Sequence, residues 1–147
     1  MALRAVSGED LAAAVNQEFP GAVVDFDEVS AWVRPTRINA VAGFLKDSPD
    51  HDFQFLNSVS AVDYVEYFDL VYHLTSLKQQ SSAVFKARIF GRDNLRAPSV
   101  YSVWRGADFQ EREIWDLMGI HFEGHPNMKR IMLWEGFEGH PLRKDFL

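Results

Sequence analysis

Apolar residues near the start of the chain recur at helical spacing. Leu11, Val15 and Phe19 lie four residues apart, so they share one face of a helix. Ser7 stands ahead of them and can cap the first turn. The Pro-Gly pair at 20–21 is typical of the end of a helix. This pattern predicts an amphipathic helix after Ser7.

Two short apolar runs and a second helical pattern come next. Residues 22–26 and 31–33 are expected to form strands on either side of an acidic turn. From Ile38 to Leu45 the apolar positions again follow helical spacing. The polar segment 47–50 contains a proline and is expected to stop that helix.

The middle of the chain shows the two-residue period of strands. Phe53 and Phe55 alternate with polar neighbours, which favours the start of a strand there. Residues 68–75 and 84–90 alternate more regularly, and the segment 79–82 is expected to be the hairpin-like loop between them. The predicted order is helix, two strands, helix, three strands. It indicates an α+β fold with helices packed on a mixed β-sheet.

The chain changes character after the third of these strands. Residues 92–98 contain Asp, Asn and Pro and are expected to form a loop. Residues 108–118 can form a helix with Ile114, Trp115 and Met118 on its apolar face. Gly119 is suited to cap the C-terminal end of that helix.

From residue 120 onward the sequence has little periodicity. Only residues 128–133 suggest a short helix. Because backbone polar groups need partners, this long tail must lie either over its own domain or on another protein. We therefore expect an α+β domain over residues 1–92. Residues 93–147 are expected to form a helix and a long, mostly irregular C-terminal docking tail.

The tail contains one internal repeat. The sequence Phe-Glu-Gly-His-Pro occurs at 122–126 and again at 137–141, and a basic pair follows each copy at 129–130 and 143–144. Glycine tolerates a positive φ, and a residue before proline is pushed towards an extended conformation. Each copy is therefore expected to form a rigid corner that presents Glu and His beside basic side chains.

Composition excludes several classes of protein. The 147 residues carry a net charge of −6 and include no cysteine. A thiolate zinc site, a thiolate-held iron–sulfur cluster and a cysteine nucleophile are therefore excluded. The acidic balance argues against a nonspecific nucleic-acid binder. No apolar stretch approaches the roughly 18–20 residues that cross a bilayer, and we expect no secretory signal.

The histidines offer one candidate site. His125 and His140 could converge with Glu123 and Glu138 to hold a metal, and with His121 they could serve a metal-dependent hydrolase. The simpler interpretation is that each imidazole bonds a nearby carboxylate or carbonyl and fixes its turn. The sequence contains no HExxH motif, and the simpler interpretation is favoured.

The predicted helix at 108–118 offers a second candidate. Glu111, Glu113 and Asp116 could supply paired carboxylates for acid–base catalysis. The alternative, which is favoured, is a structural role in which Arg112 and Asp116 form an i,i+4 pair.

The segment 143–145 could bind an anion or form a salt-bridged terminus docked on a neighbour. Neither a Rossmann fingerprint nor a P-loop is present.

Several blocks of the sequence resemble a known family. The blocks are Val62-Asp63, 68–74, 98–100, Glu-Arg-Glu-Ile-Trp-Asp-Leu-Met-Gly-Ile at 111–120, Gly-His-Pro at 124–126, Lys-Arg-Ile at 129–131 and Gly-Phe-Glu-Gly-His-Pro-Leu-Arg-Lys-Asp-Phe at 136–146. They resemble the 30 kDa subunit family, also called the C subunits, of the proton-translocating NADH:quinone oxidoreductases (respiratory complex I). The resemblance runs from about residue 53 to the end.

The resemblance implies a non-catalytic subunit of the peripheral arm, with no activity in the isolated chain. It implies no catalytic, cofactor-binding or metal-binding residues here, because FMN, the iron–sulfur clusters and the quinone site belong to partner subunits. The implied partners are the D, B and I subunits, with membrane contact only through the complex on the cytoplasmic side of the bacterial cell membrane. No nucleic acid is implied.

The resemblance also implies that the matching residues in the C-terminal third contact other subunits. Arg112, Arg130, Arg143 and Lys144 would be ionic anchors. The full set of implied interface residues is Glu111, Arg112, Glu113, Trp115, Asp116, Gly119, His125, Pro126, Lys129, Arg130, Phe137, Glu138, Gly139, His140, Pro141, Arg143, Lys144, Asp145 and Phe146.

Two departures and one alternative accompany this resemblance. Family members often have an aromatic residue where Met118 stands, and a Pro-acidic pair where 134–136 stand. Homologous subunits also occur in membrane-bound hydrogenases, formate hydrogenlyase-like complexes and ferredoxin-fed relatives. An equivalent scaffold subunit of such a complex is therefore the alternative function.

Overall fold

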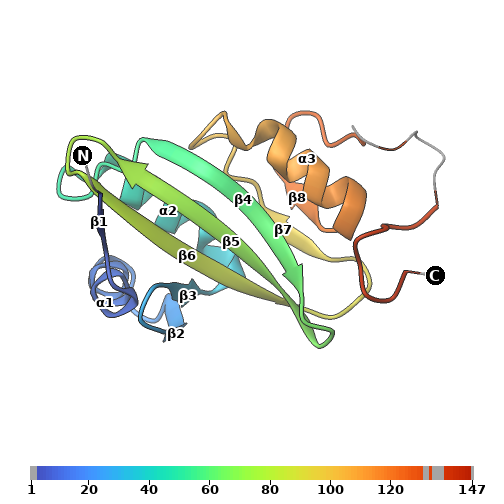
Figure 1. The fold of residues 1–147 in the computed structure, drawn as a ribbon, viewed down its shortest axis with the longest axis horizontal. Coiled ribbons are helices and arrows are strands. Elements are labelled where there is room, and N and C mark those ends of the chain that lie inside the picture. The colour runs from blue at the N-terminus through green and yellow to red at the C-terminus, as the bar shows by residue number, and fades with distance from the viewer. Residues whose placement is uncertain (1–2, 131–132, 134–137, 147) are drawn as a thin grey trace.

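The computed structural model describes residues 3–130, 133 and 138–146, and its centre is a mixed sheet. The strand order is β2-β3-β6-β5-β4, and the short β1 also pairs with β6 (Figure 1). β1 and β3 run parallel to β6, whereas β5 runs antiparallel to both β6 and β4. The strands of this sheet are β1 (Arg4–Ala5), β2 (Val23–Phe26), β3 (Ala31–Val33), β4 (Phe55–Asp63), β5 (Tyr67–Ser76) and β6 (Ser81–Phe90). The predicted α+β class with a mixed sheet is confirmed.

Helix α1 (Gly8–Glu18) begins directly after Ser7, the residue expected to cap its first turn. The Asp10 N–H donates to Ser7 Oγ at 3.1 Å, which satisfies one N–H that the helix itself leaves free. Leu11 and Val15 are buried. The apolar stripe of this helix therefore closes one end of the core.

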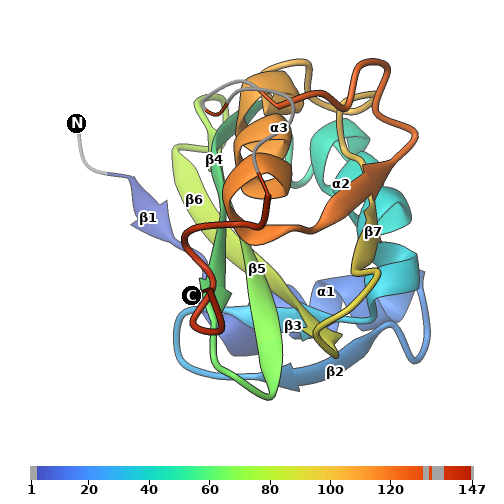
Figure 2. The same cartoon turned by 90° about the vertical axis from the view of Figure 1, so that its right-hand side faces the viewer.

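Helix α2 (Ile38–Asp47) follows a 3-10 turn, η1 (Pro35–Arg37), and covers the core face of the sheet. Its Ile38, Val41 and Leu45 are fully buried. The facing strands alternate as predicted, with Phe68, Leu70, Tyr72 and Leu74 of β5 in the core. Figure 2 shows α2 and the later helix α3 on the same side of the β4–β5–β6 strands.

Two strand boundaries differ from the prediction. β6 begins at Ser81, inside the predicted loop, because Ser81 and Ser82 pair with Ser76 and Thr75 of β5. β4 begins at Phe55, whereas Phe53 is buried in the core and its carbonyl accepts from Trp104 Nε1 at 2.9 Å. These differences arise because strand limits follow pairing and tertiary contacts, which an alternation pattern does not contain.

The second half adds β7 (Arg96–Pro98), α3 (Ala107–Met118) and β8 (His121–Glu123). The predicted helix and its cap are confirmed, since Gly119 ends α3 with a left-handed φ of 81°. The prediction that 92–98 is only a loop was wrong. β7 pairs in parallel with β8, and two three-residue strands so far apart in the chain carry no periodic signal.

The core continues across the predicted boundary at residue 92. Leu95, Trp104, Ile120 and Phe122 belong to the same buried cluster as the strands and helices before them. α3 also shields the edge strand β4, because the Val59 N–H donates to Gln110 Oε1 at 2.7 Å. Residues 121–130 and 138–146 lie over their own domain, which is one of the two alternatives above.

Two remaining expectations concern helices. Residues 128–130 have no regular secondary structure, and residues 131–132 of the suggested short helix lie outside the described residues. Within the described part of the chain, no helix has both the length and the apolar character needed to cross a membrane.

Candidate functional site

The predicted interface residues gather around α3 and the tail that lies beside it (Figure 1). Gly119, at the end of α3, allows the helix and the tail to come into close contact. A Cβ atom at this position would lie 2.7 Å from His140 Cδ2, closer than carbon atoms approach without displacement. A positive φ and this tight contact together require glycine at position 119.

Asp116 fixes the first part of the tail. Its carboxylate is fully buried, and Arg130 Nε donates to Oδ1 at 2.5 Å while the Leu133 N–H donates to Oδ2 at 2.9 Å. Arg130 also donates to the Asp116 carbonyl at 2.9 Å and to the carbonyl of Gly139. Such charge-assisted bonds are stronger than neutral ones. The predicted Arg112–Asp116 pair was wrong, since Arg130 neutralises Asp116 instead.

The two repeated corners contact opposite ends of α3. His125 Nε2 lies 3.0 Å from Asp108 Oδ1, and its Nδ1 accepts from the Asn127 N–H at 2.9 Å. His140 Nδ1 lies 2.9 Å from the Asp116 carbonyl. Asp108 and Asp116 are eight residues apart, which is about 12 Å along a helix. The imidazoles therefore fix their turns and do not converge on one site.

A second anchor holds the last part of the tail. We call Asp63, Arg92, Arg143, Lys144 and Asp145 the C-terminal clasp. Arg92 donates to both carboxylate oxygens of Asp63 at 2.7 and 2.8 Å, and its Nε donates to Asp145 at 3.0 Å. The Lys144 N–H donates to Asp63 Oδ2 at 2.7 Å. Arg143 donates to the carbonyl of Arg92.

The electrostatics of the clasp follow from these bonds. The Arg92 guanidinium beside Asp63 holds the pKa of that buried carboxyl well below its usual range. The same guanidinium lowers the pKa of Asp145, which is half exposed. Asp63 therefore stays charged through the ordinary pH range and orders three backbone segments at once.

Sequence reasoning gave no role to Asp63 or Arg92. Asp63 lies in one of the family-like blocks, yet nothing in its neighbourhood indicates an ion pair with a residue 29 positions later. Only the position of Asp63 at the end of β4, before the turn that leads into β5, brings the two together.

The three predicted carboxylates of α3 lie in different surroundings. Glu111 is fully buried, where it accepts from Ser99 Oγ at 2.5 Å and from the Val100 N–H at 2.9 Å. Burial raises the pKa of Glu111 to about 7. Asp116 is paired as described above, and Glu113 is exposed. These three groups therefore do not form a shared site.

The other predicted residues divide into contacts and exposed groups. Arg112 Nε donates to the Lys129 carbonyl at 2.9 Å, and Trp115 packs against His140 with ring centroids 5.3 Å apart. Phe146 would clash with a Cβ atom at Gly139, at 2.9 Å. Exposed side chains include Glu113, Pro126, Lys129, Glu138, Lys144 and Asp145, whereas Pro141 is half-buried. Phe137 lies outside the described residues.

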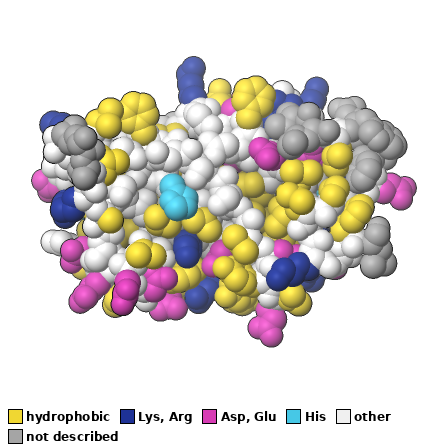
Figure 3. All heavy atoms as spheres, viewed as in Figure 1, with side chains coloured by type: hydrophobic (Ala, Val, Ile, Leu, Met, Phe, Trp, Pro, Cys, Tyr) yellow, Lys and Arg dark blue, Asp and Glu magenta, His cyan; other side chains and the backbone are white. Residues whose placement is uncertain are grey.

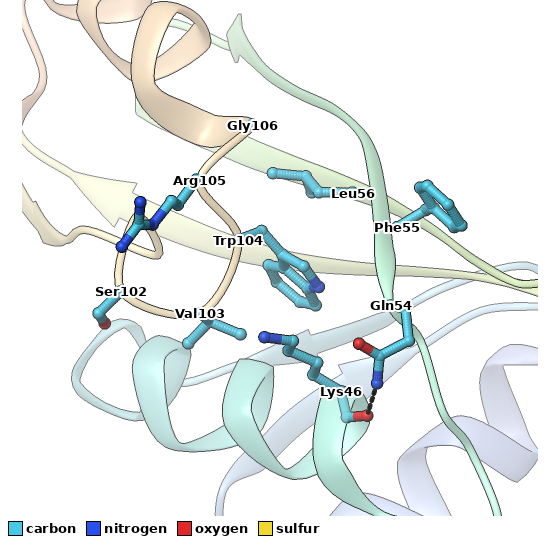
Figure 4. Close-up of a pocket in the computed structure, with 9 residues that line it drawn as sticks. All are labelled: Lys46, Gln54, Phe55, Leu56, Ser102, Val103, Trp104, Arg105 and Gly106. Atoms are coloured by element: carbon cyan, nitrogen blue, oxygen red, sulfur yellow. Dashed lines mark hydrogen bonds between the residues drawn. The ribbon is translucent and has the colours of Figure 1, made fainter.

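Two further observations concern ligands. Within the described ranges, no group of three or more His, Asp or Glu side chains could hold a metal ion. A hollow of about 390 Å³ lies between the end of α2 and the start of α3. Figure 4 shows its lining residues, with Trp104 between Lys46 and Leu56. None of the predicted interface residues lines this hollow.

Known proteins are similar to this chain in sequence and in fold. The C subunit of the NADH-quinone oxidoreductase of Roseiflexus sp. (strain RS-1) is 41% identical over 140 residues, covering 93% of this chain and 80% of that protein. The C 2 subunit of the same enzyme from Rhizobium meliloti (strain 1021) is 45% identical over 117 residues, covering 78% and 63%. The chain thus spans about three to four fifths of these relatives.

A solved structure is also similar. A chain of the membrane-bound sulfane sulfur reductase, an archaeal respiratory membrane complex, matches with a TM-score of 0.69 and 29% identity, covering 95% of this chain and 85% of that one. The profile of the family described as "Respiratory-chain NADH dehydrogenase, 30 Kd subunit" matches residues 31–147. This chain therefore belongs to the 30 Kd subunit family of the respiratory-chain NADH dehydrogenases.

Proposed function

We propose that the chain is a structural and assembly subunit in the peripheral arm of a proton-translocating NADH:quinone oxidoreductase. It docks on the D, B and I subunits and supports electron transfer from NADH to quinone without a redox centre of its own. FMN, the iron–sulfur clusters and the quinone belong to partner subunits. The chain reaches the membrane only through the complex, on the cytoplasmic side.

The observation that carries this proposal is the anchored tail. Asp116 and Asp63 hold the tail backbone on α3 and β4, while Lys129, Glu138 and Lys144 point their charged ends to solvent. Within the described residues the Lys144 ammonium group has no hydrogen-bond or ion-pair partner. A segment that is ordered in advance loses less conformational entropy on binding. The tail is thus suited to present fixed contacts to another subunit.

The test is affinity isolation of the tagged chain from gently solubilised native membranes. Wild-type chain is expected to recover the D, B and I subunits together with NADH-binding subunits. Lys144→Glu is expected to lower that recovery by roughly fivefold or more, because it places a like charge against a partner carboxylate. Lys78→Glu, at an exposed turn far from the tail in sequence, is the matched control. Wild-type recovery with Lys144→Glu, together with normal turnover of the complex, would contradict the docking role.

A second candidate function is the equivalent scaffold subunit of a related respiratory complex. The similarity to a chain of the sulfane sulfur reductase favours it. Recovery with hydrogenase subunits, or with a complex that lacks NADH-binding subunits, would support this function over the first.

A further inference from the structure

A groove of about 610 Å³ opens where β3 and β6 end and β2 begins, beside η1 and β7. Its floor is apolar, since Val33 is fully buried and Ile89 is 6% exposed. Its rim is also apolar but open to solvent, since Phe90 is 69% exposed and Val24 is 48% exposed. On the face shown in Figure 3, exposed hydrophobic side chains lie among both basic and acidic ones. Exposed apolar side chains around a hollow are typical of a binding surface.

Three guanidinium groups line the same groove. They belong to Arg34, Arg88 and Arg96, and no carboxylate is among the lining residues. Arg88 has two acidic neighbours, with Asp25 at 3.4 Å and Asp69 at 4.0 Å. Because these two carboxylates compensate Arg88, the positive charge of the groove comes from Arg34 and Arg96, in a chain that as a whole carries a charge of −6.

All three arginines have donors available: Arg34 and Arg88 are held by neighbouring groups, whereas Arg96 is not. Arg34 uses only Nε, which donates to the Gly21 carbonyl at 2.8 Å. The Arg88 guanidinium lies 4.6 Å from the centre of the Trp32 ring. Arg96 lies in β7, opposite His121 of β8, and within the described part of the chain its side chain has no hydrogen-bond or ion-pair partner. Arginine forks of this kind match carboxylates with two parallel bonds.

We propose that this groove binds an acidic peptide segment of a partner protein, with an apolar side chain next to its carboxylates. The carboxylates face Arg34 and Arg96, and the apolar side chain covers Ile89 and Phe90. A groove of this volume is within the range of specific ligand sites. The proposal goes beyond the function above, because the groove contains none of the tail residues and uses different side chains.

The test uses the purified full chain and two synthetic peptides. One is acetyl-Asp-Phe-Asp-Leu-Glu-amide, and the other replaces each acid by its amide. Titrations are followed through the methyl resonances of Val33 and Ile89. The acidic peptide is expected to bind at least about tenfold more tightly, because its carboxylates form charge-assisted bonds.

Two arginine variants sharpen the test. Arg96→Glu is expected to lower the affinity for the acidic peptide by about tenfold or more, since it reverses a charge in the groove. Arg37→Glu, an exposed arginine of η1 that does not line the groove, is expected to leave the affinity within about twofold. Equal thermal unfolding midpoints would show that both variants are folded.

Three outcomes would overturn the proposal. They are equal affinity for the two peptides, absence of shifts at Val33 and Ile89 at millimolar peptide, and no effect of Arg96→Glu. Shifts of the same size with inorganic phosphate, or with phosphatidylglycerol vesicles alone, would show an anion or lipid site instead of a peptide site. Because Lys144→Glu leaves the groove unchanged, failure here is distinguishable from failure of tail docking.

Discussion

Asp63, Asp116 and Glu111 are buried carboxylates that differ in what stabilises them. Asp63 and Asp116 each accept from an arginine and from a tail backbone N–H, so they connect tail segments to the sheet and to α3. Glu111 accepts only from neutral donors, Ser99 Oγ and the Val100 N–H. A buried charge without a cation is costly, which explains why burial raises the pKa of Glu111.

Asp63→Asn tests the clasp. Removing the charge leaves the buried part of Arg92 without its main partner, so the free energy of unfolding should fall by about 3 kcal/mol. Faster amide exchange is expected at residues 143–146. Asp93→Asn, an exposed neighbour of Arg92, should change stability by less than about 0.5 kcal/mol. Urea unfolding and hydrogen exchange measure both effects, and equal stability of the two variants would contradict the role of Asp63.

The same variant gives a pH dependence. Because the pKa of Asp63 is depressed in the folded chain, its stabilising effect is complete above the unfolded pKa of about 3.9. The effect is lost as the pH falls through the lower folded pKa. The stability difference between wild type and Asp63→Asn should therefore shrink as the pH is lowered from about 5 to 2.

Glu111→Gln tests a pH dependence of stability with the opposite sign. The folded pKa of about 7 lies above the unfolded value, so the native chain holds a proton that the unfolded chain releases. Stability is then present at low pH and is lost as the pH rises through about 7. Between pH 5 and 8 the wild type should lose roughly 2–3 kcal/mol relative to Glu111→Gln. Parallel pH profiles of the two proteins, measured by urea unfolding, would refute this.

At the scale of elements, α3 organises the C-terminal half. Its buried face packs on the sheet through Ile114 and Met118, its Gln110 shields the edge of β4, and its two ends receive His125 and His140. The end of the helix is decisive, because Gly119 turns the chain and also leaves room for the His140 ring.

Gly119→Ala tests that end. A methyl group at φ 81° is strained and would meet the His140 ring, so the free energy of unfolding should fall by about 1–3 kcal/mol. Gly106→Ala is the matched control, since a Cβ atom there meets no atom within 4 Å and φ is −61°. It should change stability by less than about 1 kcal/mol. Similar losses in both variants would show that Gly119 has no special role.

At the scale of the whole molecule, one core joins the two halves of the chain. Trp104, Ile120 and Phe122 lie in the same cluster as Phe68 and Tyr72. The division at residues 92 and 93 is thus a change in sequence character, and whether it also separates two folding units is a question of stability.

A fragment of residues 1–92 answers that question. Without the second half, apolar surface around Phe68, Tyr72 and Phe53 is exposed to water, so the fragment is expected to lack a cooperative unfolding transition. Thermal melts and amide spectra, compared with the full chain, measure this. A sharp transition with dispersed resonances would establish residues 1–92 as an independent domain.

The sequence predicts well where a local pattern is strong. Ser7 and Gly119 mark the ends of α1 and α3, and the alternation in β5 identifies the residues that face the core. It does not predict β1, β7 or β8, because each has only two or three residues and exists through a partner far along the chain. The same holds for the Arg130–Asp116 pair, which replaced the local i,i+4 pair.

The sequence by itself determined the fold class, the family resemblance and the presence of an irregular C-terminal tail with a repeated motif. Periodicity, caps and motifs are local properties of the chain, so they can be read from the sequence. Only the tertiary structure decided which charges meet. Asp63 with Arg92, Asp116 with Arg130 and the three arginines of the groove come together through sheet order and helix packing. Such contacts depend on distances in space between residues far apart in sequence, which no short-range pattern contains.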